Sequence, residues 1–134
     1  MEKIDKKQIS KTIRVGITHG DCNGIGYEVI LKTLANPVFL EYCIPVIYGV
    51  EYVMKEYLKV LNIQDFKYNL LKKDQVAVSK KVNLIDIQPD FKKLTIGKST
   101  EDSGKLALKS LEEALKDLKN NKINFFTHCN LVFL

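Results

Sequence analysis

Short apolar runs alternate with amphipathic stretches along this chain of 134 residues. Runs rich in β-branched residues predict strands, and apolar positions spaced by three and four predict helices. The strands are expected at 13–18, 45–49, 82–87 and 123–126, with weaker candidates at 66–71, 75–78 and 94–96; the helices are expected at 24–35, 51–61 and 101–120. Alternating strands and helices favour an α/β fold, a layered and largely parallel sheet with flanking helices.

Two polar residues stand where helices are expected to begin. Asn23 precedes the first predicted helix and Thr100 precedes the last, and both are residue types that cap helix N-termini. In the last helix Leu108, Leu111, Leu115 and Leu118 form one apolar stripe with Ala107 and Ala114 beside it, and we expect this stripe to be only partly covered in this chain.

Composition is that of an ordinary globular domain, with 46% hydrophobic and 28% charged residues. The net charge of +5 comes from scattered lysines with one arginine, Arg14, so no nucleic-acid surface is expected. Three cysteines without a C-x-x-C pair favour a reducing, cytoplasmic location. The polar residues 1–12 are interpreted as a flexible leader rather than a signal peptide, and no stretch is long and apolar enough to suggest a membrane partner.

A glycine-rich turn joins the first strand to the first helix and reads Thr-His-Gly-Asp-Cys-Asn-Gly-Ile-Gly-Tyr-Glu over 18–28. Its spacing is not that of a dinucleotide fingerprint, and Gly97-Lys98-Ser99 lacks the first glycine of a phosphate-binding P-loop. Two interpretations remain. The glycines allow close approach of backbone to an anionic ligand at a helix start, or they only form a tight turn.

The turn resembles T-x-G-D-P-A-G-I-G-P-E, the amino-terminal signature of the 4-hydroxythreonine-4-phosphate dehydrogenase family of vitamin B6 biosynthesis. The segment 45–49 is similar to the second strand of that family, and Gly97, Ser99, Gly104 and Ala107 fit its segment G-x-S-x-x-x-x-G-x-x-A. The resemblance spans residues 13–124 and covers only the first part of a family member. Cys22, Asn23 and Tyr27 replace the Pro, Ala and Pro of the signature.

The resemblance implies a fold like that of isocitrate and isopropylmalate dehydrogenases, here incomplete. It implies oxidation and decarboxylation of 4-phosphooxy-threonine with NAD or NADP and a divalent metal that polarises the carbonyl. It also implies a small phosphorylated substrate and a homodimer for the full-length protein. The residues carried over as substrate- or cofactor-binding candidates are Asp21, Gly24, Gly26 and Glu28. No catalytic residue, metal ligand or cofactor is expected for this chain alone.

Two histidines and one cysteine could in principle bind a metal or react, but each has an ordinary structural interpretation. His19 and His128 are far apart in the sequence and match no family metal ligand. Cys22 lies near a helix start, which can lower the pKa of a thiol, but no partnering base is visible. A plain turn cysteine is the favoured interpretation.

Residues 125–134 are interpreted as an aberrant tail, because the family continues with D-x-L-V-T-A-P while this chain reads Phe-Phe-Thr-His-Cys from Phe125. Codons for 126–130 read one base later can encode Leu-Leu-Thr-Ala, so we expect a truncation or frameshift near Asn124. The chain is then an inactive fragment of the dehydrogenase. The alternatives are a non-enzymatic α/β anion-binding module and a pseudogene-type remnant.

Overall fold

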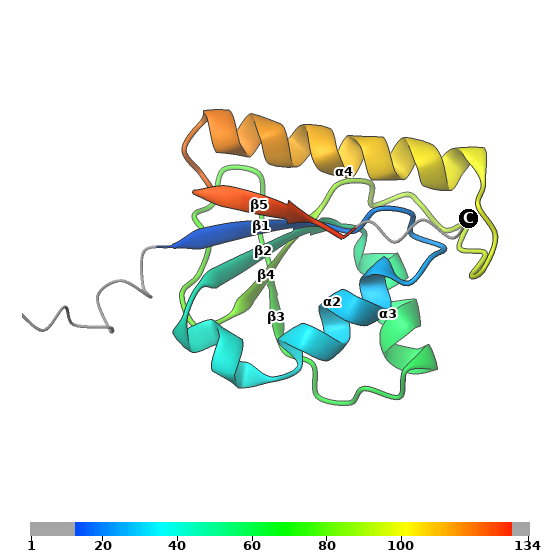
Figure 1. Ribbon diagram of the computed structural model, residues 1–134, viewed down its shortest axis with the longest axis horizontal. Coiled ribbons are helices and arrows are strands. Elements are labelled where there is room, and N and C mark those ends of the chain that lie inside the picture. The colour runs from blue at the N-terminus through cyan, green and yellow to red at the C-terminus, as the bar shows by residue number, and fades with distance from the viewer. Residues whose placement is uncertain (1–12, 130–134) are drawn as a thin grey trace, which may run out of the picture.

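The computed structural model describes residues 13–129, which form a five-stranded parallel sheet with helices on both faces (Figure 1). The strands are β1 (Arg14–Thr18), β2 (Ile44–Gly49), β3 (Tyr68–Leu70), β4 (Val82–Asp86) and β5 (Phe125–His128). The helices are α2 (Gly26–Leu34), α3 (Glu51–Val60) and α4 (Glu101–Lys119), with a 3-10 turn, η1, at Pro37–Glu41. The predicted α/β architecture is confirmed.

The spatial order of the strands is β3-β4-β2-β1-β5, and every neighbouring pair is parallel. Figure 1 shows α2 and α3 on one face and α4 on the other. The strand β2 lies in the middle of the sheet and is buried along its whole length, as expected for a parallel strand covered on both faces. Within the described residues no helix is long and apolar enough to cross a membrane.

The core on the α2 and α3 side is apolar and aromatic. Tyr27 and Leu31 of α2 and Met54 and Tyr57 of α3 are almost fully buried, and the rings of Tyr27 and Tyr57 stack with centroids 5.4 Å apart. Both helices begin at the carboxyl end of the sheet, so their N-termini lie at the same edge as the ends of β1 and β2.

The leucine stripe of α4 is only partly covered, as predicted. The buried residues are Ser103, Leu106, Ser110 and Ala114, whereas Leu108 and Leu115 are 57% and 39% exposed. Small residues allow close approach to the sheet, and the Ser110 hydroxyl satisfies its polarity by donating to the Tyr48 carbonyl oxygen at 2.6 Å. Small and polar residues, which the apolar pattern did not indicate, therefore form most of the buried face of α4.

Two weak strand predictions also fail. The segment 75–78 is irregular because the Asn83 side chain holds it: Oδ1 accepts from the Val78 N–H at 2.8 Å and Nδ2 donates to the Val78 carbonyl at 3.0 Å. The segment 94–96 is likewise outside the sheet. The predicted strand at 66–71 is present as the shorter β3.

The last described part of the chain forms a strand, near the strand predicted at 123–126. Residues Phe125–His128 form β5 and pair with β1, with Val15 opposite Phe125. The leader 1–12 and residues 130–134 lie outside the described residues. The origin of the segment in a shifted reading frame stays a prediction.

Candidate active site

The order of the strands reverses between β1 and β5. From β1 the chain moves to β2 on one side, and it later crosses back through α4 to place β5 on the other side. In open α/β sheets, ligands bind in the crevice at such a switch point, outside the carboxyl ends of the strands. Here that position is occupied by the end of β1, the turn 19–25 and the end of β5.

Asp21 shapes the turn from within. Its Oδ1 accepts a hydrogen bond from the Asn23 N–H at 2.9 Å, and its carbonyl accepts from the Gly24 N–H at 3.0 Å. Gly20 has φ of 68°, in the left-handed region that favours glycine. Asp21 is half-buried.

Gly26 is required for steric reasons. A Cβ at this position would lie 2.1 Å from the His19 carbonyl oxygen and 3.4 Å from that of Cys129. This close backbone approach makes Gly26 critical to the backbone of the turn. Because the turn is pressed between the ends of β1 and β5, its geometry depends on both strands.

The hydroxyl of Tyr57 on α3 holds the turn, and the hydroxyl of Tyr27 on α2 bonds the residue that precedes α3. The Tyr57 hydroxyl lies 2.7 Å from the Cys22 carbonyl and 2.9 Å from the Gly24 carbonyl, so its proton satisfies two acceptors of the turn. The Tyr27 hydroxyl accepts from the Val50 N–H at 2.9 Å. Tyr27 stands where the family signature has a proline, so a side-chain bond to Val50, the N-cap of α3, replaces a rigid ring. Sequence reasoning missed Tyr57, whose apolar helical spacing gave no sign of a contact with the turn.

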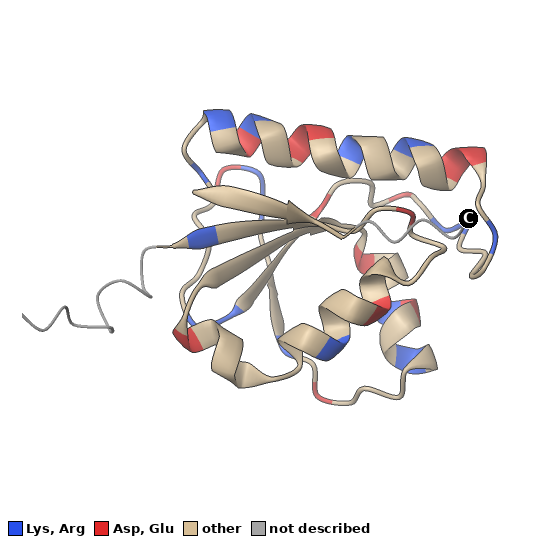
Figure 2. Ribbon diagram, in the orientation of Figure 1, with Lys and Arg blue, Asp and Glu red and all other residues tan. Residues whose placement is uncertain are grey.

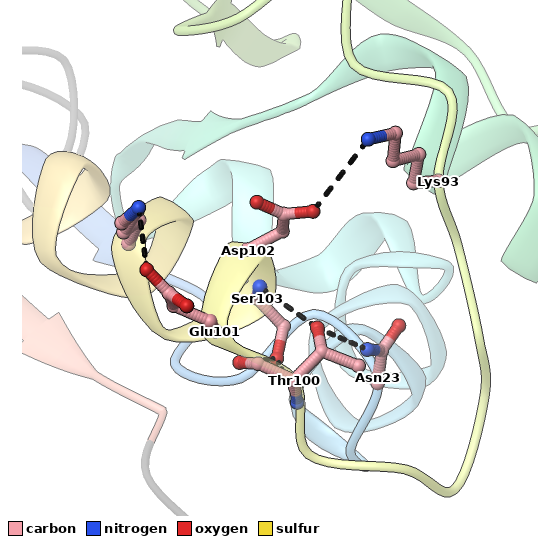
Figure 3. Close-up of polar contacts among 7 residues, drawn as sticks. Asn23, Lys93, Thr100, Glu101, Asp102 and Ser103 are labelled. Atoms are coloured by element: carbon pink, nitrogen blue, oxygen red, sulfur yellow. Dashed lines mark hydrogen bonds and ion pairs between the residues drawn. The ribbon is translucent and has the colours of Figure 1, made fainter.

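The prediction that Asn23 is the N-cap of α2 is wrong. Asn23 is instead buried and links the turn to the loop before α4. The helix begins at Gly26 after Ile25, without a side-chain cap. The Oδ1 of Asn23 accepts from the Thr95 N–H at 2.9 Å, and its backbone carbonyl accepts from the Gly97 N–H at 2.8 Å. Its Nδ2 lies 3.5 Å from the Thr100 Oγ1 (Figure 3).

Thr100 is the N-cap of α4, as predicted. Its Oγ1 accepts from the Ser103 N–H at 3.1 Å, and the Ser103 Oγ accepts from the Thr100 N–H at 3.0 Å, which completes a capping box (Figure 3). Through Asn23, the turn and the start of α4 therefore form one hydrogen-bonded unit.

The remaining candidates have defined surroundings. Glu28 lies in the first turn of α2 and pairs with Lys32 at 2.6 Å on the surface. Burial raises the pKa of Cys22 to about 12, so this thiol stays protonated and the thiolate alternative is wrong. Burial lowers the pKa of His19 to about 4, and neither ring nitrogen has a hydrogen-bond partner among the described residues. The imidazole is therefore neutral at physiological pH.

The divalent metal implied by the family does not fit the donors placed here. Across residues 13–129, no three His, Cys, Asp or Glu side chains come together as a metal site. His19 is fully buried against Tyr27, with ring centroids 4.9 Å apart, and the Nδ1 of His128 is hydrogen-bonded to the Thr18 hydroxyl. Neither histidine is assigned to a metal.

The chemical group presented at this position is the amino-terminal end of α2. The helix has no side-chain cap, so its first N–H groups and its positive end suit an anion. Around it lie the half-buried Asp21 carboxylate and the Thr18–His128 pair. The fold is that of an α/β protein in which the turn 19–25 and the start of α2 lie at the switch point of the sheet.

Comparisons with known proteins give the family. The model of the pyridoxal phosphate biosynthetic protein PdxA matches residues 41–130, and the chain belongs to that family. The 4-hydroxythreonine-4-phosphate dehydrogenase of Bacteroides thetaiotaomicron is 37% identical over 112 residues, covering 84% of this chain and 30% of the relative. A protein of Oceanobacillus iheyensis, provisionally named a D-threonate 4-phosphate dehydrogenase, is 29% identical over 118 residues, covering 86% of this chain and 35% of its own length.

Solved structures agree on the fold. A 4-hydroxythreonine-4-phosphate dehydrogenase from Burkholderia phymatum superposes with a TM-score of 0.74 at 22% identity, covering 87% of this chain and 36% of the other. One from Klebsiella pneumoniae gives 0.73 at 21%, covering 87% and 36%. The chain thus spans about a third of the length of these proteins.

Proposed function

We propose that this chain carries part of the ligand site of an NAD- or NADP-dependent dehydrogenase of a phosphorylated four-carbon hydroxy acid. The single observation that carries the proposal is the position of the turn 19–25 at the switch point between β1 and β5. The family relationship supports the reaction class, and the relative from Bacteroides supports 4-phosphooxy-threonine as substrate.

Within this site each residue has a role that its contacts allow. The uncapped start of α2 attracts an anionic group of the substrate or cofactor, and Gly26 lets backbone approach closely. Asp21 forms the turn with one oxygen and offers the other to a ligand hydroxyl. Glu28, in the first turn of α2 and paired with Lys32, is a further binding candidate carried over from the signature. A nicotinamide cofactor held near the start of α2 would supply the hydride acceptor for oxidation of the substrate.

The donors for the divalent metal that the family implies are assigned to the two thirds of the family protein that this chain does not span. We therefore expect these 134 residues alone not to reduce NAD or NADP. The assay mixes the purified chain with 4-phosphooxy-threonine, either cofactor and a divalent metal. Measurable turnover from a monodisperse sample would contradict this division of the site.

The proposal itself is tested by a chimera. Residues 13–129 replace the matching segment of the Bacteroides relative, and NAD and NADP reduction is followed with 4-phosphooxy-threonine and with D-threonate 4-phosphate. We expect turnover of one substrate with kcat/KM well above that of the relative lacking the segment. A folded, inactive chimera would favour the alternative, a non-enzymatic α/β module that binds anions at the same turn.

A further inference from the structure

At the opposite end of the sheet lies a cavity of about 230 Å³ that the proposed function does not use. It is roofed by the loop that follows β3 and walled by the start of β1 and the end of α4, elements that Figure 1 shows gathered at this end. The Lys122 ammonium donates to the Lys73 carbonyl at 3.1 Å and so fastens the roof to the turn after α4.

The walls divide into an apolar part and a charged part. Val46, Leu71, Val76, Ile85 and Ile123 supply the apolar surface. Arg14, Lys73 and Lys122 supply three positive charges against two carboxylates, Asp74 and Asp117. Figure 2 shows basic segments on β1, on the loop after β3 and at the end of α4.

One carboxylate is already engaged. The Tyr48 hydroxyl donates to the Asp117 Oδ2 at 2.8 Å, and burial together with this bond raises the pKa of Tyr48, so the hydroxyl keeps its proton. The walls therefore retain an excess of positive charge at neutral pH. An anion entering the cavity is attracted rather than repelled.

Arg14 has an unmet hydrogen-bond donor. One terminal nitrogen donates to the Asn121 carbonyl at 3.1 Å, but Nε is buried and has no partner among the described residues. A buried guanidinium N–H without an acceptor is costly, and such groups generally have a partner, either protein, water or ligand. A carboxylate matches the fork of donors on an arginine.

We infer that this cavity binds a small organic carboxylate, with its two oxygens at Arg14 and its apolar body against Leu71, Val76 and Ile123. The volume equals that of about seven or eight liquid waters at about 30 Å³ each, which suits an acid of a few carbons and excludes a dinucleotide. The site is separate from the crevice at the carboxyl ends of the strands.

The probe is 3-methylbutanoate, titrated into the isotope-labelled chain and followed through backbone amide shifts. We expect shifts at Arg14, Ala77 and Ile123, with 3-methylbutan-1-ol and inorganic phosphate each at least about tenfold weaker, since one lacks the charge and the other the apolar body. Shifts elsewhere only, equal binding of the alcohol, or tighter binding of phosphate would overturn the assignment.

Two variants decide the role of the cavity. Arg14→Gln should weaken 3-methylbutanoate about tenfold or more, whereas the exposed Lys98→Gln, of equal charge change, should leave binding unchanged. Because Arg14→Gln also removes the bond to Asn121, Ala77→Leu serves as a second variant that fills the cavity and keeps Arg14. Retention of binding in folded Ala77→Leu, or an equal loss in Lys98→Gln, would contradict the inference.

Discussion

The turn between β1 and α2 and the outer flank of α4 are both glycine-containing segments next to the same sheet, yet the turn is tightly packed and the flank is open. The turn is held by Asp21, Tyr57 and Asn23 and leaves no room for a Cβ at Gly26. On α4, Gly104 has open space around it, and Leu108 is largely exposed. Backbone contacts therefore restrict which residues the turn can hold. Few contacts within residues 13–129 restrict the residues on the outer flank of α4.

The strand β5 resembles the outer flank of α4 in leaving apolar surface exposed. It is the edge strand beside β1, and Phe125 is 53% exposed. The exposed leucines of α4 and this edge form surface that is apolar and, for the described residues, uncovered. Exposed apolar patches and unpaired strand edges promote association.

The largest effect on stability is expected when Gly26 is changed to alanine, compared with the same change at Gly104. Gly26→Ala forces a Cβ against the His19 carbonyl and should cost about 3 kcal/mol or more of unfolding free energy, because backbone atoms cannot move aside easily. Gly104→Ala is the matched control and should stabilise by up to about 1 kcal/mol, because alanine is the better helix former. Urea unfolding of both variants measures the difference, and similar costs for both would erase the contrast between the regions.

His19 makes the stability of the turn depend on pH. Its pKa is lowered in the folded chain to about 4, against about 6.5 in the unfolded chain, so the unfolded chain binds the proton more tightly and stability falls as pH drops through that window. Between pH 7 and pH 5 the loss should be about 2 kcal/mol. Urea unfolding at both pH values measures it.

His19→Gln should reduce this pH dependence, because glutamine does not titrate. An unchanged slope in the variant would show that His19 is protonated in the folded chain as readily as in the unfolded one.

Tyr57→Phe tests the anchor from α3 and should destabilise by about 1–2 kcal/mol, since two buried carbonyls of the turn lose their donor. Tyr52→Phe is the control: it keeps the ring beneath the Lys92 ammonium, 4.8 Å from its centroid, and removes a hydroxyl without a recorded partner among the described residues. Thermal unfolding that ranks Tyr52→Phe as the costlier change would remove Tyr57 from this account.

The smallest effect on stability is expected from Leu108→Gln combined with Leu115→Gln. Both side chains are exposed, so unfolding free energy should change by no more than about 0.5 kcal/mol per site. Self-association of the chain should fall, which sedimentation velocity over a range of concentrations measures. Unchanged association would place the contact elsewhere, with the edge of β5 the next surface to test.

Much of the fold could be predicted because the strands are short apolar runs and the helices have clear periodicity. The face of α4 could not, because Ser110 buries a hydroxyl that finds the Tyr48 carbonyl only in three dimensions. Asn23 has the residue type of a helix cap, but its partners Thr95 and Thr100 are more than 70 residues away in the sequence. The signature indicated Asp21 and Gly26 but not Tyr57, since long-range contacts leave no local pattern.

The central claim is that the turn at the switch point binds ligand as well as shaping the chain, and Asp21→Asn in the chimera with the Bacteroides relative tests it most directly. Asparagine keeps an Oδ1 that can accept from the Asn23 N–H, so the turn is preserved while the charge is lost. We predict that kcat/KM falls about tenfold or more at unchanged unfolding free energy, while the exposed Asp90→Asn leaves both unchanged. Equal kcat/KM for the Asp21→Asn and Asp90→Asn chimeras, at equal stability, would contradict the claim and leave Asp21 only its role in the turn.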